Sequence, residues 1–300
     1  MTAPSAAAQG VASSARRPRR GRASRIVLHL TIVGLVVLWL IPTLGLLINS
    51  FRPADLMTKS GWWTAILAPT QFTLENYVAV LNESDIAPAF VNSLIISIPA
   101  TIIPVMVAAF AAYAFAWMSF PGRNVLFVVV VGLLVVPLQT TLIPVLQLFG
   151  PRGLGIAGSF LAVWLAHTAY GLPFAIFLLR NFMGELPREV FESAAIDGAS
   201  PVTSFLRLAL PMSVPAIAAL AIFQFLFVWN DLLVALVYIG AANAANLPLT
   251  VVIANLVNSL GGGWQLLAAA AFISMALPLA VFFALQRYFV RGIVGGSVKG

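Results

Sequence analysis

The chain contains no cysteine, and charged residues make up only 8% of its 300 residues. The lack of cysteine excludes disulfides and thiolate metal sites, and it leaves the redox compartment open. A soluble domain carries about 25% charged residues, so this chain is too poor in charge to be one. Hydrophobic residues instead account for 61% of the sequence, which favours a protein embedded in a lipid bilayer.

Nucleotide-binding and catalytic patterns are also missing. The only lysines are Lys59 and Lys299, and neither lies in a G-x-x-x-x-G-K-[ST] phosphate loop. The two histidines are not spaced as a metal-binding pair, and no G-x-S-x-G nucleophile motif occurs. We therefore expect a protein that is not an enzyme and has neither a metal site nor its own ATP site.

Long apolar runs recur along the chain, and each is long enough to cross a bilayer. A transmembrane β-barrel would show short alternating segments instead. The hydropathy pattern predicts six spans, at approximately 26–48, 92–118, 125–148, 159–180, 214–238 and 265–287. The predicted fold class is therefore an all-α polytopic membrane protein with six transmembrane helices. The first run is too long for a signal peptide and is interpreted as a retained span.

Basic residues are distributed unevenly around these spans. Residues 1–25 are rich in arginine, alanine, serine and proline, and we expect them to form a disordered cytoplasmic segment. With this end inside, only Arg52, Lys59 and Arg152 of the 16 lysines and arginines face outward. Both termini are therefore predicted to be cytoplasmic. This arrangement favours a topology anchor that can also attract anionic lipid, and nucleic-acid binding is not expected.

The connection between the fourth and fifth spans is predicted to form two short helices. Pro187 suits the first turn of a helix, and Gly198 permits the backbone reversal that ends it. Ser200 and Pro201 suit the cap and first position of a second helix, and Pro211 is expected just past its end. An ordinary amphipathic surface hairpin would also account for these features.

Within this connection, residues 192–211 read ESAAIDGASPVTSFLRLALP. The spacing of its Glu-Ser-Ala, Gly198, Leu208 and Leu-Pro positions resembles the EAA loop of the membrane subunits of binding-protein-dependent ABC importers. Ser193 and Leu208 stand where that family's pattern has Ala and Ile, and both changes keep size or polarity. The resemblance assigns the loop, residues 181–213, to docking on an ATPase subunit. The coupling residues that it implies are Glu192, Ser193, Ala194, Asp197, Gly198, Leu208 and Pro211.

Further segments resemble the sugar-importer branch of this family, from about residue 27 to the end of the chain. They include FTLENY at 72–77, AYA at 112–114, FQFLFVWND at 223–231 and GGSVKG at 295–300. The likeness is strongest to the smaller permease of maltose-type and α-glucoside-type importers. It implies a six-helix domain, residues 26–287, with the fold of a type I ABC importer permease in the bacterial cytoplasmic membrane.

The resemblance also implies a function and a set of partners. The function is ATP-driven import of an oligosaccharide, an α-glucoside of the maltose or trehalose type. The partners are a second permease subunit, two ATP-binding subunits that use ATP and Mg²⁺, and an extracytoplasmic sugar-binding protein. The C-terminal tail, residues 288–300, is expected to reach the ATPase dimer, unless it merely frays. A secondary sugar transporter, a permease for a non-sugar substrate and an intramembrane enzyme are the alternatives.

Polar residues in apolar spans are costly, so they are candidates for the substrate pathway. The candidates are Gln224, Trp229, Asn230, Asp231, His167 and Tyr170, with Gln139, Thr140 and Thr141 as further polar positions. Asn230 and Asp231 fall in the outer part of the fifth span, and Gln224 lies two turns earlier on roughly the face of Asp231. Phe225 and Phe227 offer aromatic surfaces to a sugar. The alternative is that these polar groups only tie helices together.

Overall fold

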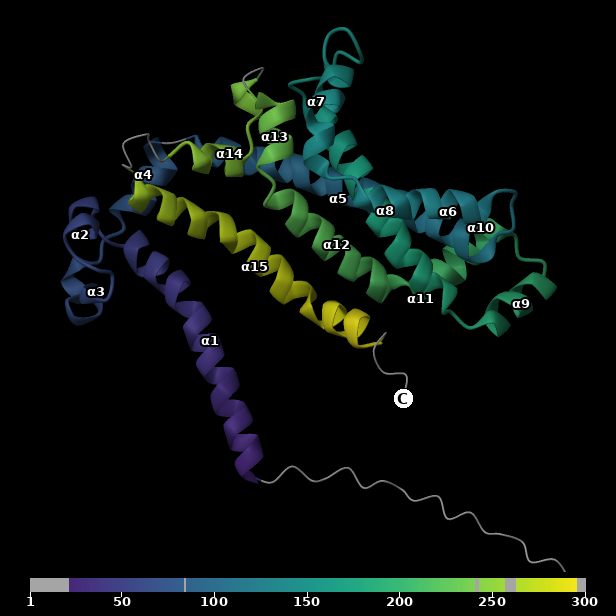
Figure 1. Ribbon diagram of the computed structural model, residues 1–300, viewed down its shortest axis with the longest axis horizontal. Helices are drawn as coiled ribbons and strands as arrows, with labels where there is room; N and C mark the ends of the chain where they lie inside the picture. The colour runs from purple at the N-terminus through teal and green to yellow at the C-terminus, as the bar shows by residue number, and fades with distance from the viewer. Residues whose placement is uncertain (1–21, 84, 241–242, 257–262, 296–300) are drawn as a thin grey trace, which may run out of the picture. The chain divides into compact units, whose positions relative to one another are not determined.

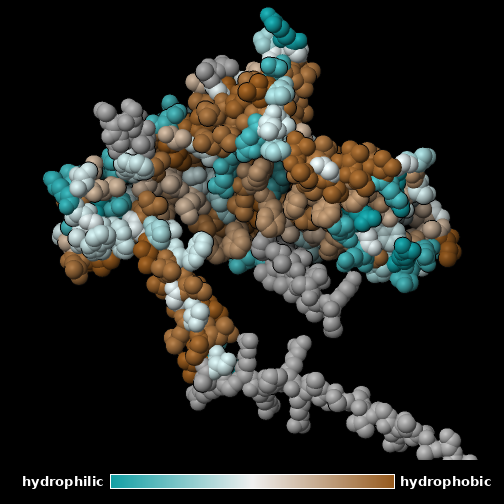
Figure 2. All heavy atoms as spheres, in the orientation of Figure 1, coloured by the Kyte–Doolittle hydropathy of each residue, from teal (hydrophilic) through white to brown (hydrophobic). Residues whose placement is uncertain are grey.

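The computed structural model describes residues 22–83, 85–240, 243–256 and 263–295, and its regular structure in these ranges is entirely helical. The chain divides into two units, Met1–Leu46 and Leu47–Gly300. The first unit contains most of helix α1 (Arg22–Ser50), whose apolar side chains are exposed almost all round (Figure 2). A helix with this surface is suited to contact with lipid.

The second unit is organised around four long helices (Figure 1). Helix α5 (Ile86–Trp117) packs along α8 (Phe160–Gly184), while α12 (Val214–Trp229) packs against both α5 and α15 (Trp264–Gly295). Hydrophobic residues dominate the middle of this unit, and hydrophilic residues gather towards its ends (Figure 2). This distribution is typical of a bundle that crosses a membrane.

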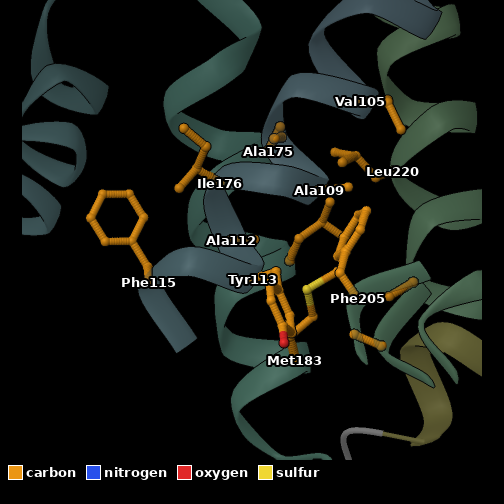
Figure 3. Close-up of a cluster of buried hydrophobic side chains, with 14 of the residues drawn as sticks. Val105, Ala109, Ala112, Tyr113, Phe115, Ala175, Ile176, Met183, Phe205 and Leu220 are labelled. Carbon is orange, nitrogen blue, oxygen red and sulfur yellow. The ribbon is translucent and has the colours of Figure 1, made fainter. Parts of the chain in front are cut away.

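Small side chains allow the helices of the second unit to pack closely. Ala108 and Ala112 of α5 and Ala175 of α8 are almost completely buried in one cluster. In Figure 3 larger side chains of the same cluster, including Met183 and Phe205, lie beside Ala112. Without a side chain beyond Cβ, alanine lets two backbones approach, which is the usual basis of helix packing in lipid.

One predicted span is sharply broken. Residues 125–148 form α6 (Arg123–Gly132), the 3₁₀ turn η2 (Leu133–Val135) and α7 (Leu138–Phe149). The two halves are bent by 103° at Pro137, which has no N–H to donate and holds the preceding Val136 extended. The predicted span is therefore a bent pair of helices.

The fifth predicted span, residues 214–238, is also interrupted. Helix α12 ends at Trp229, and the chain resumes as α13 (Leu233–Tyr238). The carboxylate of Asp231 accepts hydrogen bonds from the amides of Val234 at 3.3 Å and Ala235 at 3.1 Å. Asp231 therefore caps a new helix instead of lying within a continuous one, which corrects the prediction.

By length and composition, four described helices can cross a membrane, and up to six can if each of two bent pairs counts as one span. The second pair joins Pro201–Met212 to Val214–Trp229 at an angle of 73°. The all-α polytopic class is thus confirmed, with four to six candidate spans among the described residues.

The shorter elements lie between the long helices. They are α2 (Ala54–Lys59), α3 (Thr64–Leu67), η1 (Pro69–Gln71), α4 (Glu75–Glu83), η5 (Ala244–Asn246) and α14 (Leu249–Ala254). The fully buried Arg52 organises the first of these segments, since its guanidinium donates to Asn49 Oδ1 at 3.1 Å, Leu56 O at 3.1 Å and Ser60 Oγ at 2.6 Å. Most of the predicted disordered segment and the residues after Gly295 lie outside the described ranges.

Candidate functional site

The connection after α8 forms a series of short elements at the end of the second unit where α5 and α8 finish (Figure 1). They are α9 (Arg188–Ile196), α10 (Pro201–Ser204), the π-helical turn η3 (Phe205–Ala209) and α11 (Leu210–Met212). Gly198 has a φ of +79°, a left-handed conformation that favours glycine. The amide of Ala199 donates to Ala194 O at 2.9 Å, and that of Gly198 donates to Ala195 O at 3.1 Å. Two such bonds form a Schellman cap, as the predicted reversal at Gly198 requires.

The second helix begins as predicted but does not end as predicted. The hydroxyl of Ser200 accepts a hydrogen bond from the amide of Thr203 at 3.1 Å, and Pro201 occupies the first position. Helical structure then continues through η3 into α11, where Pro211 lies inside the helix and not beyond it. Pro211 is tolerated because it falls in the first turn after the π-helical register shift, where a missing N–H costs little.

The surface of this loop is open to a partner. Of the predicted coupling residues, Glu192, Ser193, Asp197, Gly198 and Pro211 are exposed, while Ala194 and Leu208 are half-buried. Three apolar side chains beside them are also exposed: Ile196 by 87%, Val202 by 65% and Leu206 by 50%. These three were missed from the sequence, although an apolar residue in a polar loop was an available signal. Exposed apolar groups gathered on a polar loop suit a protein contact.

Helix α9 is attached to the bundle at one buried side chain. Phe191 is its sole buried residue, and the Phe191 ring stacks on Trp117 with centroids 3.9 Å apart and planes at 21°. The indole N–H of Trp117 in turn donates to Met183 O at 2.9 Å, which satisfies a carbonyl in the last turn of α8. A cleft of about 670 Å³ lies beside this contact, with Arg188 and Glu192 among its lining residues.

The predicted pathway residues separate into two groups. In the first, His167 is fully buried and its Nε2 lies 3.7 Å from Asp231 Oδ2. Neither ring nitrogen of His167 has a hydrogen-bond partner among the described residues. The hydroxyl of Tyr170 contacts Tyr238 Oη at 2.6 Å and accepts from Thr141 Oγ1 at 3.0 Å. These three hydrogen-bonded hydroxyls join α7, α8 and α13. Tyr238 was not among the candidates chosen from the sequence, although a tyrosine in an apolar run was an available signal.

The second group bonds to backbone carbonyls. The amide of Gln224 donates to Ala100 O at 3.2 Å, and the indole of Trp229 donates to Ser274 O at 3.2 Å. Both side chains are buried, whereas Asn230 is exposed and donates to Leu226 O at 2.8 Å within its own helix. Gln139 and Thr140 are exposed on α7.

Two further buried hydroxyls were not predicted. Ser97 and Thr101 lie four residues apart on α5, and neither hydroxyl has a hydrogen-bond partner in the described part of the chain. Their helical spacing was the signal that could have identified them. Within the same described ranges, no group of three or more metal-ligating side chains is placed to hold a metal ion, so the lack of a metal site stays a prediction.

A bundle of membrane-crossing helices, polar groups in its interior and short exposed helices at one end define a polytopic membrane transport subunit. Residues 104–295 match the family of binding-protein-dependent transport system inner membrane components, and the chain belongs to this family. The predicted family is thus confirmed, and with it an inner-membrane permease subunit that works with a binding protein.

Two relatives match almost the whole chain. The "Osmoprotective compounds uptake permease protein GgtD" of Synechocystis sp. is 58% identical over 278 residues, which cover 92% of each chain. The "Alpha-glucoside transport system permease protein AglG" of Rhizobium meliloti is 42% identical and covers 91% of this chain and 96% of its own. A chain from the crystal structure of a bacterial ABC transporter involved in alginate import superposes with a TM-score of 0.73 at 19% identity, covering 91% of this chain and 100% of its own. That superposition confirms the predicted fold.

Proposed function

We propose that this chain is one of two permease subunits of an ATP-driven importer for a neutral oligosaccharide of the α-glucoside class. The observation that carries the proposal is its likeness to the α-glucoside permease AglG along nearly the full length of both chains. A second permease, two ATP-binding subunits and an extracytoplasmic sugar-binding protein complete the proposed complex. ATP and Mg²⁺ belong to the ATPase partners, because this sequence has no phosphate loop.

The exposed loop supports the proposed docking on an ATPase. Ile196, Val202 and Leu206 present apolar surface next to the acidic Glu192, a combination that suits a groove with an apolar floor and a basic rim. Closure of the ATPase dimer then pushes on α9 and α10 and turns the bundle from inward-facing to outward-facing. Hydrolysis resets it. In this orientation the loop and both termini are cytoplasmic, as the bias of basic residues favours.

Neutral groups in the bundle support a neutral substrate. The hydroxyls of Thr141, Tyr170 and Tyr238 form one connected chain, and sugar hydroxyls bond well to such groups. The ionisable side chains nearby are His167 and Asp231, which face each other. Transport of a strongly charged substrate would need fixed charges of opposite sign in the pathway.

A second candidate substrate is an osmoprotective compound, which the 58% identity to GgtD favours. The two candidates overlap for sugars that act as osmoprotectants, and they differ for zwitterionic osmolytes. The hydroxyl chain described above favours the sugar.

The test is purification of the intact complex followed by mass spectrometry of the ligand held by its binding protein. Reconstituted complex is then assayed for ATPase stimulation by the binding protein with maltose, with trehalose or with glycine betaine. Stimulation by the two α-glucosides alone is the expected result. Stimulation by betaine alone would replace the sugar with a zwitterionic osmolyte, and purification without any ATPase subunit would overturn the proposed complex.

A further inference from the structure

Three prolines interrupt the hydrogen-bond ladders of helices α5 and α15 without breaking them. Pro99 and Pro104 lie inside α5, and Pro278 lies inside α15. A proline has no N–H, so in each case the carbonyl four residues earlier loses its helical donor. Those carbonyls belong to Ile95, Ala100 and Ser274, and an unsatisfied carbonyl inside a membrane is costly.

Each freed carbonyl receives a hydrogen bond from a side chain of another helix. The indole of Trp164 on α8 donates to Ile95 O at 2.9 Å. Gln224 on α12 donates to Ala100 O at 3.2 Å, and Trp229 on α12 donates to Ser274 O at 3.2 Å. The three donors therefore connect α8 to α5, α12 to α5 and α12 to α15, which are neighbouring helices in Figure 1.

The side-chain amide of Gln224 occupies a space that is open because residue 171 is a glycine. Gly171 of α8 faces the Gln224 amide, and a Cβ added there would lie 2.7 Å from Oε1 and 2.8 Å from Nε2. Ala100 is fully buried, and Gln224 is 7% exposed. No water-accessible alternative therefore replaces this donor if the amide is lost.

We propose that Trp164, Gln224 and Trp229 are positioning residues that lock helices α5, α8, α12 and α15 into one body that moves together during transport. The donors satisfy carbonyls that the prolines of α5 and α15 set free, and in doing so they tie each of these proline sites to the neighbouring helix. This inference rests on the proposed transport function only for the movement. The hydrogen bonds themselves can be tested without it.

The test uses Gln224 and Pro104 together. Gln224→Met keeps the length of the side chain and removes its N–H, so it leaves Ala100 O without a donor. Pro104→Ala restores a backbone N–H that can reach the same carbonyl. In the detergent-purified complex, we expect Gln224→Met to lower the thermal midpoint by about 2–4 °C or more. Adding Pro104→Ala should recover most of that loss.

Transport is the second readout, measured as sugar imported per ATP hydrolysed in proteoliposomes. Both Gln224→Met and the double variant should import less sugar per ATP, because α5 and α12 are no longer linked in either protein. A merely structural role would restore this ratio together with the thermal midpoint. Gly171→Ala should resemble Gln224→Met, although alanine alone favours a helix.

Pro144→Ala in α7 is the matched control, because it removes a helix-interior proline away from Gln224. Its effect should simply add to that of Gln224→Met. The hydrogen-bond assignment is overturned if the double variant melts no higher than Gln224→Met. The role in movement is overturned if the double variant recovers wild-type import per ATP. If the wild-type complex neither contains an ATPase nor imports sugar, the proposed function fails. The comparison of thermal midpoints still tests the hydrogen bond from Gln224 to Ala100 O.

Discussion

Substitution of Gly198 tests whether the turn between α9 and α10 docks on a partner. Gly198 has a φ of +79°, and a Cβ added there meets no atom of the described residues within 4 Å. An L-residue in this conformation costs about 1–2 kcal/mol, which corresponds to a factor of about 5–30 in the ratio of the correct turn to its alternatives. Gly198→Ala should therefore reduce coupled sugar uptake through the backbone alone, by at most a factor of that order.

A pair of variants separates this backbone effect from a clash with the partner. Asparagine and aspartate have nearly the same shape, and both tolerate the left-handed conformation better than alanine. Gly198→Asn should thus be mild. Gly198→Asp adds a negative charge at the C-terminal end of α9, where the helix dipole opposes it by about 0.3–1 kcal/mol, and at the proposed docking surface. We expect Gly198→Asp to insert normally and to uncouple uptake from ATP hydrolysis.

The assay compares sugar uptake and ATP hydrolysis for all three variants in proteoliposomes that contain equal amounts of assembled complex. Asparagine and aspartate place nearly the same atoms around a Cβ that meets no described atom within 4 Å. A loss in Gly198→Asp beyond that in Gly198→Asn, once the effect of the helix dipole is allowed for, therefore supports a contact with a partner. Unchanged sugar uptake in Gly198→Asp at matched protein level would refute the docking role.

Four further substitutions or truncations extend the test. Glu192→Ala should weaken coupling about fivefold at most without preventing assembly, because an exposed ion pair contributes only about 0–1 kcal/mol; complete loss of the ATPase from the purified complex would contradict this. Phe191→Leu should lower import per ATP by about two- to tenfold by removing the ring stack of α9, whereas Phe115→Leu should not, because the described ring contacts of Phe115 are with Phe120 and Phe127. Arg52→Ala should destabilise the protein by about 1.5–3 kcal/mol, seen as a lower thermal midpoint, and an unchanged midpoint would show that its buried hydrogen bonds contribute nothing. Deletion of 295–300 should reduce sugar-stimulated ATPase activity, and wild-type activity would identify the tail as a frayed terminus.

The sequence predicted the spans because a bilayer imposes a minimum apolar length, but it did not separate the prolines that break a span from those that stay inside a helix. Pro137 breaks one predicted span, while Pro99 and Pro104 remain inside a continuous helix. The donors to the carbonyls freed by Pro99 and Pro104 are remote in the chain, since Trp164 and Gln224 reach α5 across 69 and 124 residues. The residues next to a proline do not reveal such distant donors. A proline in an apolar run therefore indicates where a helix can break, but not whether it does.

The first half of the loop after α8 could be predicted, because the residues that shape it bond to near neighbours in the sequence. Gly198 and Ser200 act through bonds to residues within five positions, and the structure contains those bonds. The π-helical turn at Phe205–Ala209 was not predictable, because it depends on Phe205 packing against Phe110 and Tyr113 of α5. Tertiary packing there selects the helical register. The helix therefore continues through Pro211, which was expected to lie just past its end.

Contacts between residues that are distant in the chain also reduce the number of candidate residues for the substrate pathway. Gln224 and Trp229 were chosen from the sequence because polar groups are rare in apolar spans, yet in the structure each donates to a carbonyl four residues before a proline. The need to satisfy these backbone carbonyls is enough to explain why polar side chains occur at the two positions. Pro173 of α8 frees the carbonyl of Ala169 in the same way, but no described hydrogen bond joins the side chain of His167 or Tyr170 to it. The described contacts of these two residues are with the side chains of other elements. A polar residue in a span supports substrate contact only after the carbonyls freed by nearby prolines have been counted, and by that criterion the hydroxyl chain of Tyr170 is the stronger candidate.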